Sequence, residues 1–91
     1  MLQKEGKYIV VFSSNYHAYY IEELLRRHGV GTLYKKAPRA IAKSCNSAIY
    51  LFHEEDLSKT LKLIEDAKVP SKGVYEIIRS EKAIAYKKVL L

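Results

Sequence analysis

The sequence predicts a small α+β domain, and three observations lead to that fold class. The chain has 91 residues, which is enough for one domain and too few for two. Its 48% hydrophobic and 29% charged residues are typical of a globular protein with a core. Short runs of β-branched and aromatic residues alternate with two segments of helical periodicity.

Four segments are expected to form β-strands. Residues 8–12, with the sequence Tyr-Ile-Val-Val-Phe, are β-branched or aromatic throughout, which predicts a first strand over residues 7–13. Further strands are expected over residues 30–36, 47–53 and 73–79. The tail over residues 81–91 carries apolar side chains, but their spacing leaves strand and helix equally open.

Two segments show the spacing of an amphipathic helix. The first is expected over residues 16–28, with caps in the preceding Ser-Ser-Asn and a stop at Gly29. The second has its apolar face on Leu57, Leu61, Ile64 and Ala67. Three acidic residues at positions 54–56 complement the start of this second helix, and Pro70 closes the region.

The predicted order is β-α-β-β-α-β, which is the ferredoxin-like two-layer sandwich. Residues 1–80 are expected to form this single domain, and residues 81–91 a C-terminal extension that packs on the domain or on a partner subunit. In this topology the third strand lies antiparallel between the first and second, so its start at Ser47 is expected beside the end of the first strand at Ser13.

Several features argue for a cytoplasmic protein with a free thiol. The apolar run near the amino terminus is too short for a signal peptide, and no stretch is long enough to span a bilayer. Cys45 is the single cysteine, which excludes an internal disulfide, a two-cysteine redox motif and a zinc site of several thiolates. No metal and no cofactor are expected. The net charge of +6 fits either a nucleic-acid partner or a solvated surface, and its scatter along the chain favours the solvated surface.

The chemistry of the sequence is concentrated in the loop from Pro38 to Cys45. A cysteine reacts as its thiolate, which nearby cations and helix amino termini favour. Lys43 and Arg39 precede Cys45, and the expected topology brings the amino end of the first helix close. These features suit a thiol that accepts sulfur as a persulfide. The spacing alone leaves open a buried cysteine that only fills space.

The remaining polar residues near this loop are candidate substrate or anion ligands. Arg39 follows Pro38, so a planar guanidinium on a stiff backbone either binds an anion or braces the loop. His17 serves either as a base beside the thiol or as a packed or capping side chain. We expect a site that joins Cys45 to the following residues: Arg39, Lys43, Ser44, Ser13, Ser14 and His17.

A set of short motifs connects the sequence to a known family. They are Phe12-Ser13-Ser14, His17-Ala18, Glu23-Leu24-Leu25 with Gly29, Pro38-Arg39 with Ile41, Ser44-Cys45 with Ala48, and Val74-Tyr75-Glu76. In this order and spacing the sequence resembles the small bacterial domains called putative selenium/sulfur carrier protein-like, over residues 8–76. The resemblance implies that Cys45 carries sulfur or selenium with Arg39 beside it. It also implies a donor protein as partner, such as a cysteine desulfurase, and a carrier in preference to a stand-alone enzyme.

One residue departs from the family pattern. The family favours Gly after the cysteine, and this chain has Asn46. Asn is the residue that, after Gly, best tolerates a left-handed backbone, so the turn is compatible with this change.

Two other classes of function compete with the carrier. An RNA-binding module on the same fold needs exposed aromatic residues near Ser47 and Ile49, but the aromatic residues of that strand are Tyr50 and Phe52. A protein-interaction or assembly domain is favoured because the first and third strands are apolar on both faces, whereas the helices cover only one. Either the tail or a second copy of the chain is expected to cover the other face, and a homodimer is predicted. Tyr16 and Tyr19 lie opposite the apolar stripe of the first helix and add an exposed aromatic patch.

Overall fold

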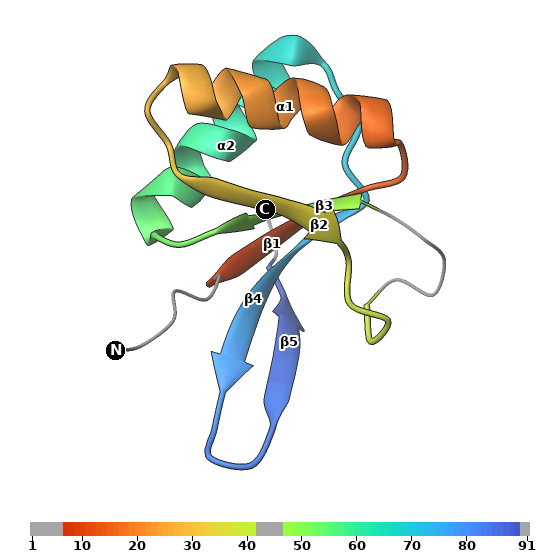
Figure 1. Ribbon diagram of the computed structural model, residues 1–91, viewed down its shortest axis with the longest axis vertical. Helices are drawn as coiled ribbons and strands as arrows, with labels where there is room; N and C mark the ends of the chain where they lie inside the picture. Colours follow the sequence, from red (N-terminus) through yellow and green to blue (C-terminus); the bar gives the residue numbers. More distant parts are fainter. Residues whose placement is uncertain (1–6, 42–46, 90–91) are drawn as a thin grey trace.

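The computed structural model describes residues 7–41 and 47–89 (Figure 1). These residues form five strands and two helices. In chain order the elements are β1 Tyr8–Phe12, α1 Asn15–Arg27, β2 Thr32–Lys36, β3 Ser47–Leu51, α2 Glu54–Ala67, β4 Gly73–Arg79 and β5 Ile84–Lys88. The six elements predicted from the sequence are all present, within a few residues of their expected bounds.

The strands form one antiparallel sheet in the order β2-β3-β1-β4-β5. As expected, β3 lies between β1 and β2 and runs opposite to both, with Phe12 of β1 paired to Ser47 of β3. The mixed α+β class is therefore confirmed. The sheet differs from the expected four-stranded sandwich by a fifth strand, β5, which pairs along β4 from Tyr75 to Arg79.

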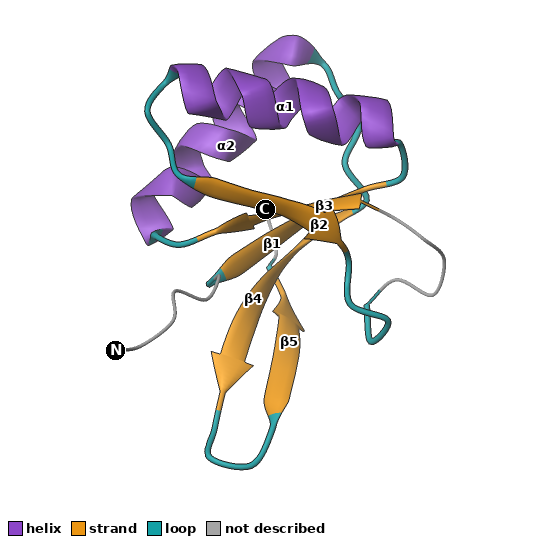
Figure 2. Cartoon of the chain, in the orientation of Figure 1, coloured by secondary structure: helices purple, strands orange, loops and turns teal. Residues whose placement is uncertain are grey.

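Both helices cover the same face of the sheet, as Figure 2 shows. Alternate residues of the central strands point to this helix-covered face, because successive side chains in a strand point to opposite sides. The fully buried Val10 and Phe12 of β1 and Ile49 of β3 pack there with Ile21 of α1. This face holds the larger part of the hydrophobic core.

The opposite face, here called the helix-free face, is also buried at its centre. Its cluster consists of Ile9, Val11, Ala48, Tyr50 and Ile77, each at most 8% exposed. The partly buried side chains packed against this cluster come from the loop after β2 and from the edge of the sheet; they are Ala37, Ile41, Tyr75 and Tyr86. On this face, loop residues and tyrosine rings therefore exclude water from the cluster, as the helices do on the other face.

The C-terminal segment forms a strand, which settles the alternative left open by its sequence. β5 extends the edge of the sheet instead of lying across the helix-free face (Figure 1). Tyr86 still reaches the helix-free cluster, and the N–H of Val89 donates to the carbonyl of Val74 at 2.8 Å. The far end of the β4–β5 hairpin carries Ile78 and Ile84, which are 45% and 55% exposed.

The two helices end in different ways. After α1, Gly29 adopts a positive φ of 77°, the left-handed conformation that glycine tolerates best, so the expected stop is confirmed. After α2, the left-handed position is taken by Lys68, with φ 58° and ψ 39°. A side chain with a Cβ is strained in that conformation.

Candidate functional site

The amino end of α1 lies at the carboxyl end of β1, where the sequence placed part of the site. Ser14 is the cap residue, with an extended backbone at φ −121° and ψ 128°. Its carbonyl accepts the N–H of Ala18 at 3.2 Å, but its side chain makes no capping hydrogen bond. The first turn of α1 contains no acidic residue, so its partial positive charge is not neutralised from within the helix.

Three polar side chains fasten the start of β3 to this helix end. Ser47 is 4% exposed, and its hydroxyl donates to the amide oxygen of Asn15 in the first turn of α1. The hydroxyl of Tyr34 on β2 lies 3.0 Å from the same Ser47 oxygen. This Asn15–Ser47–Tyr34 cluster joins α1, β3 and β2, and Ser47 follows Cys45 by two positions in the sequence.

His17 belongs to the same helix end. Its Nδ1 atom is buried and has no hydrogen-bond partner among the described residues. Its ring lies 5.9 Å from that of Tyr16, at an interplanar angle of 57°. Both roles expected for His17, a base beside the thiol and a packed or capping side chain, stay predictions.

The described part of the loop after β2 packs on the other face of the sheet. Ala37 and Ile41 contact the helix-free cluster, and the N–H of Ile41 donates to the carbonyl of Pro38 at 3.1 Å. Arg39 lies exposed within this turn. In Figure 1 the loop runs from the end of β2 away from the helices. Arg39 therefore starts from the face opposite to the one that holds Ser14 and His17.

Three of the predicted site residues, Lys43, Ser44 and Cys45, lie outside the described residues, as does Asn46. Ser13, Ser14 and His17 lie in the turn after β1 and the first turn of α1, where Asn15 bonds to Ser47 at the start of β3. Their arrangement around the thiol stays a prediction.

Two side chains of the helix-free face form a polar contact near the loop. The Nζ atom of Lys35 lies 4.8 Å from the centre of the Tyr50 ring, a cation–π distance. The hydroxyl of Tyr50 donates to the carbonyl of Lys36 at 3.4 Å. Burial raises the pKa of Tyr50, and the neighbouring Tyr86 raises it further.

A second surface lies on the outer side of α1. The expected exposure of Tyr16 and Tyr19 is confirmed, at 75% and 59%. With Tyr20 and Tyr34 they line a shallow groove between α1 and β2, where the rings of Tyr19 and Tyr34 stack at 4.5 Å. The sequence showed the helical spacing of the first two residues, but the contribution of Tyr34 depends on how β2 lies beside the helix.

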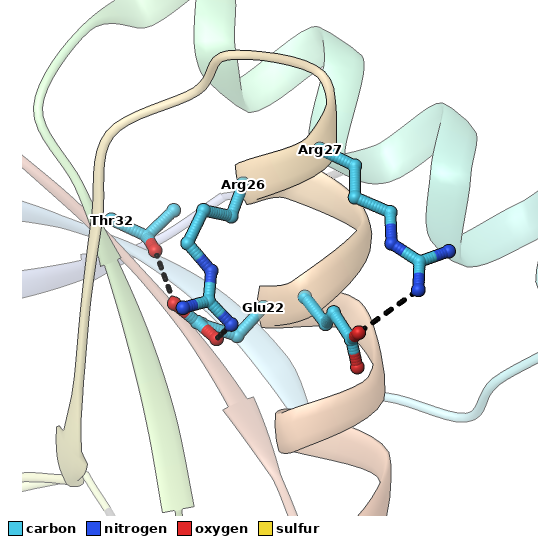
Figure 3. A network of polar contacts seen from close by, with 5 residues as sticks. Glu22, Arg26, Arg27 and Thr32 are labelled. Carbon is cyan, nitrogen blue, oxygen red and sulfur yellow. Dashed lines mark hydrogen bonds and ion pairs between the residues drawn. The ribbon is translucent and has the colours of Figure 1, made fainter.

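Polar contacts hold α1 against β2 along this groove (Figure 3). Glu22 accepts a hydrogen bond from Thr32 at 3.3 Å and forms an ion pair with Arg26 at 3.4 Å. At the adjacent positions of the helix, Arg27 pairs with Glu23 at 3.0 Å, a contact within α1. The carboxylates on the groove are thus already engaged with residues of the same chain.

Within the described parts of the chain, no cluster of three His, Cys, Asp or Glu side chains is placed to hold a metal ion. No helix among these residues is both long and apolar enough to cross a membrane.

A sheet covered by helices on one face, with the start of β3 fastened to a helix amino end, defines a small α+β domain. The model of the family described as putative Se/S carrier protein-like matches residues 7–76. Because this match covers most of the chain, the protein belongs to that family. Cys45 lies within the matched residues, whereas β5 lies beyond them. No curated protein and no solved structure matches the chain.

Proposed function

We propose that the protein carries sulfur or selenium covalently on Cys45. The observation that carries this proposal is the family match over residues 7–76, which contain the chain's single cysteine. The fastening of Ser47 to the amino end of α1 supports it, because two residues of chain hold Cys45 within about 7 Å of Ser47, Cα to Cα. A helix amino end and nearby cations such as Arg39 and Lys43 favour the thiolate that such a carrier needs.

The transfer step balances without an outside oxidant. The thiolate of Cys45 attacks the terminal sulfur of a persulfide on a donor protein, such as a cysteine desulfurase. A new S–S bond forms on Cys45 as the S–S bond of the donor breaks, and the electron pair leaves with the donor thiolate. The product is a persulfide on Cys45, and a selenium atom transfers in the same way. We propose that this group is surrounded by Lys43, Ser44, Ser13, Ser14 and His17, and that Arg39 reaches it from the helix-free side of the loop.

Intact-mass measurement tests this function directly. The protein is incubated with a cysteine desulfurase and cysteine, and it is expected to gain the mass of one sulfur atom, which a reductant removes. Cys45→Ser is the matched control and is expected to gain nothing. A native protein whose Cys45 resists alkylation and takes up no sulfur would overturn the carrier function. Asn46→Gly, which restores the family residue, is expected to take up sulfur at least as fast.

The alternative of an assembly domain is favoured by a separate observation, the exposed tyrosines of α1. We propose a homodimer that forms through the groove of Tyr16, Tyr19, Tyr20 and Tyr34, because aromatic rings exposed beside a free sheet edge suit a protein contact. Light scattering checks this. Tyr16→Glu is expected to convert the dimer to a monomer, and a monomeric native protein would exclude the dimer.

A further inference from the structure

The charges of the protein are divided between the two layers of the fold. Of the chain's ten acidic residues, α1 contributes Glu22 and Glu23, and α2 contributes the five in its sequence EEDLSKTLKLIEDA. Among the described strands and loops, the acidic residues are Glu76 and Glu81 alone, although most of the chain's lysines and arginines lie there. Among the described residues, the excess positive charge therefore lies in the strands and loops and not in the helices.

Lysines of both edge strands face the helix-free side, whereas no described acidic residue of the strands does. Lys35 of β2 faces the helix-free side, since it contacts Tyr50. Lys88 of β5 faces it too, because it lies two residues after Tyr86, and residues two apart in a strand point to the same side. Glu76 lies two residues after Val74 in β4 and so points, like Val74, to the helix-covered side. Each edge of this face therefore presents a lysine.

Apolar side chains accompany the lysines at both edges. Leu33 shares the face of Lys35 in β2 and is 42% exposed. Ile84 shares the face of Tyr86 in β5 and is 55% exposed. Between these edges the surface is closed by Tyr75, Tyr86 and the loop after β2. Charge at the rim with exposed apolar residues beside it is the composition of a surface that binds another protein.

This face also leads to the proposed site. The loop that contains Cys45 leaves β2 next to Lys36, and its residues Ala37 and Ile41 pack on the helix-free cluster. The exposed guanidinium of Arg39 belongs to the same turn. A protein bound to the helix-free face would therefore contact residues 37–41, the described start of the loop that leads to Cys45.

We propose that the helix-free face is the docking surface for the sulfur donor, a cysteine desulfurase that presents an acidic patch around its own persulfide. The proposal rests on the proposed function of Cys45. Its support is the complementarity of charge between the lysine-bearing face and an acidic partner, together with the start of the Cys45 loop on that face.

Two other occupants fit this face less well. Single-stranded nucleic acid needs exposed rings on the central strands, but Tyr50 is 8% exposed and its ring already contacts Lys35. A second copy that docked through the same face would bring like charges together, which weakens association.

Binding is measured with Cys45→Ser protein, so that docking is separated from sulfur transfer. Titration calorimetry with the desulfurase is expected to show that the double change Lys35→Glu/Lys88→Glu, here called the sheet-face variant, weakens the affinity by about tenfold or more at low salt. The loss is expected to shrink at high salt, where exposed charges are screened. Lys59→Glu/Lys62→Glu on α2 changes the same number of exposed charges and is expected to leave the affinity within about twofold.

Sulfur transfer gives the second readout, with Cys45 restored. The sheet-face variant is expected to accept sulfur slowly from the desulfurase but at the native rate from cysteine persulfide, a small donor that needs no docking surface. Equal loss with both donors would place the effect in the loop and overturn the docking surface. Equal loss of affinity in the sheet-face and α2 variants, or no binding at all, would also overturn it.

The remaining outcomes separate this proposal from its alternatives. Binding without any sulfur uptake by the native protein would contradict the carrier function and leave the docking surface standing. Fluorescence anisotropy with oligouridylate is run in parallel. The proposal would be overturned if the native protein binds this probe, the sheet-face variant does not, and both bind the desulfurase with the same affinity. That result would assign the face to nucleic acid.

Discussion

The helix-covered face and the helix-free face of the sheet differ in what excludes water from them. On one side, Ile49 is fully buried beneath helices that contribute their own apolar stripe. On the other, Ile9 is equally buried, but its cover comes from a loop and from partly exposed tyrosines. Loops and ring edges reposition more easily than packed helices, so we expect the two equally buried faces to differ in rigidity.

The largest expected effect compares these two isoleucines directly. Ile49→Ala removes the same atoms as Ile9→Ala, and both residues are 0% exposed. We expect Ile49→Ala to lower the free energy of unfolding by about 4 kcal/mol and Ile9→Ala by about 2–3 kcal/mol, because the loop collapses more readily into the space left. Urea denaturation measures both values. Equal losses would show that the helix-free cover is as rigid as the helices.

The next prediction concerns the fastening of β3 to α1. Ser47→Ala removes the hydroxyl shared by Asn15 and Tyr34 and leaves these groups unpaired in a part-buried position. We expect a loss of about 1–3 kcal/mol in unfolding free energy. A double-mutant cycle with Tyr34→Phe is expected to give a nonzero coupling energy. Additive losses in this cycle would contradict a direct interaction between the two hydroxyls.

A smaller effect is expected at the two helix ends. Lys68→Gly relieves the left-handed strain after α2 and is expected to stabilise the protein by about 0.5–1 kcal/mol. The matched change at the other helix, Gly29→Ala, places a Cβ where φ is 77° and is expected to destabilise by about 1 kcal/mol. Thermal unfolding followed by circular dichroism measures both, and opposite signs are the required result.

The last prediction concerns pH and is confined to alkaline conditions. Burial, and secondarily Tyr86, raises the pKa of Tyr50 above the ordinary value of 10.0. Above pH 10 the unfolded phenol ionises while the folded one stays protonated, so the stability present below that pH is lost as the pH rises. Tyr50→Phe is expected to flatten this decline in urea denaturation at alkaline pH. The exposed Tyr16→Phe serves as the control, and identical curves for both variants would contradict the prediction.

The elements of this fold were predictable because their signals are local. The apolar run of β1, the spacing of Ile21 and Leu25 in α1, and Gly29 at its end each depend on neighbouring residues. The order of the elements then placed Ser47 beside the end of β1, as the register confirms. The motifs that carry the family resemblance could also be identified in the sequence, and the family match covers them.

Other features depended on tertiary structure. The apolar spacing of residues 81–91 is compatible with a strand or a helix. The pairing of this segment with β4 decides for the strand β5. The loop residues Ala37 and Ile41 have no periodicity, so their packing on the helix-free face was set by the space available there. The sequence by itself determined the elements, the family and the single thiol. The three-dimensional packing decided which face residues 37–41 of the loop occupy, because that choice rests on contacts between residues far apart in the chain.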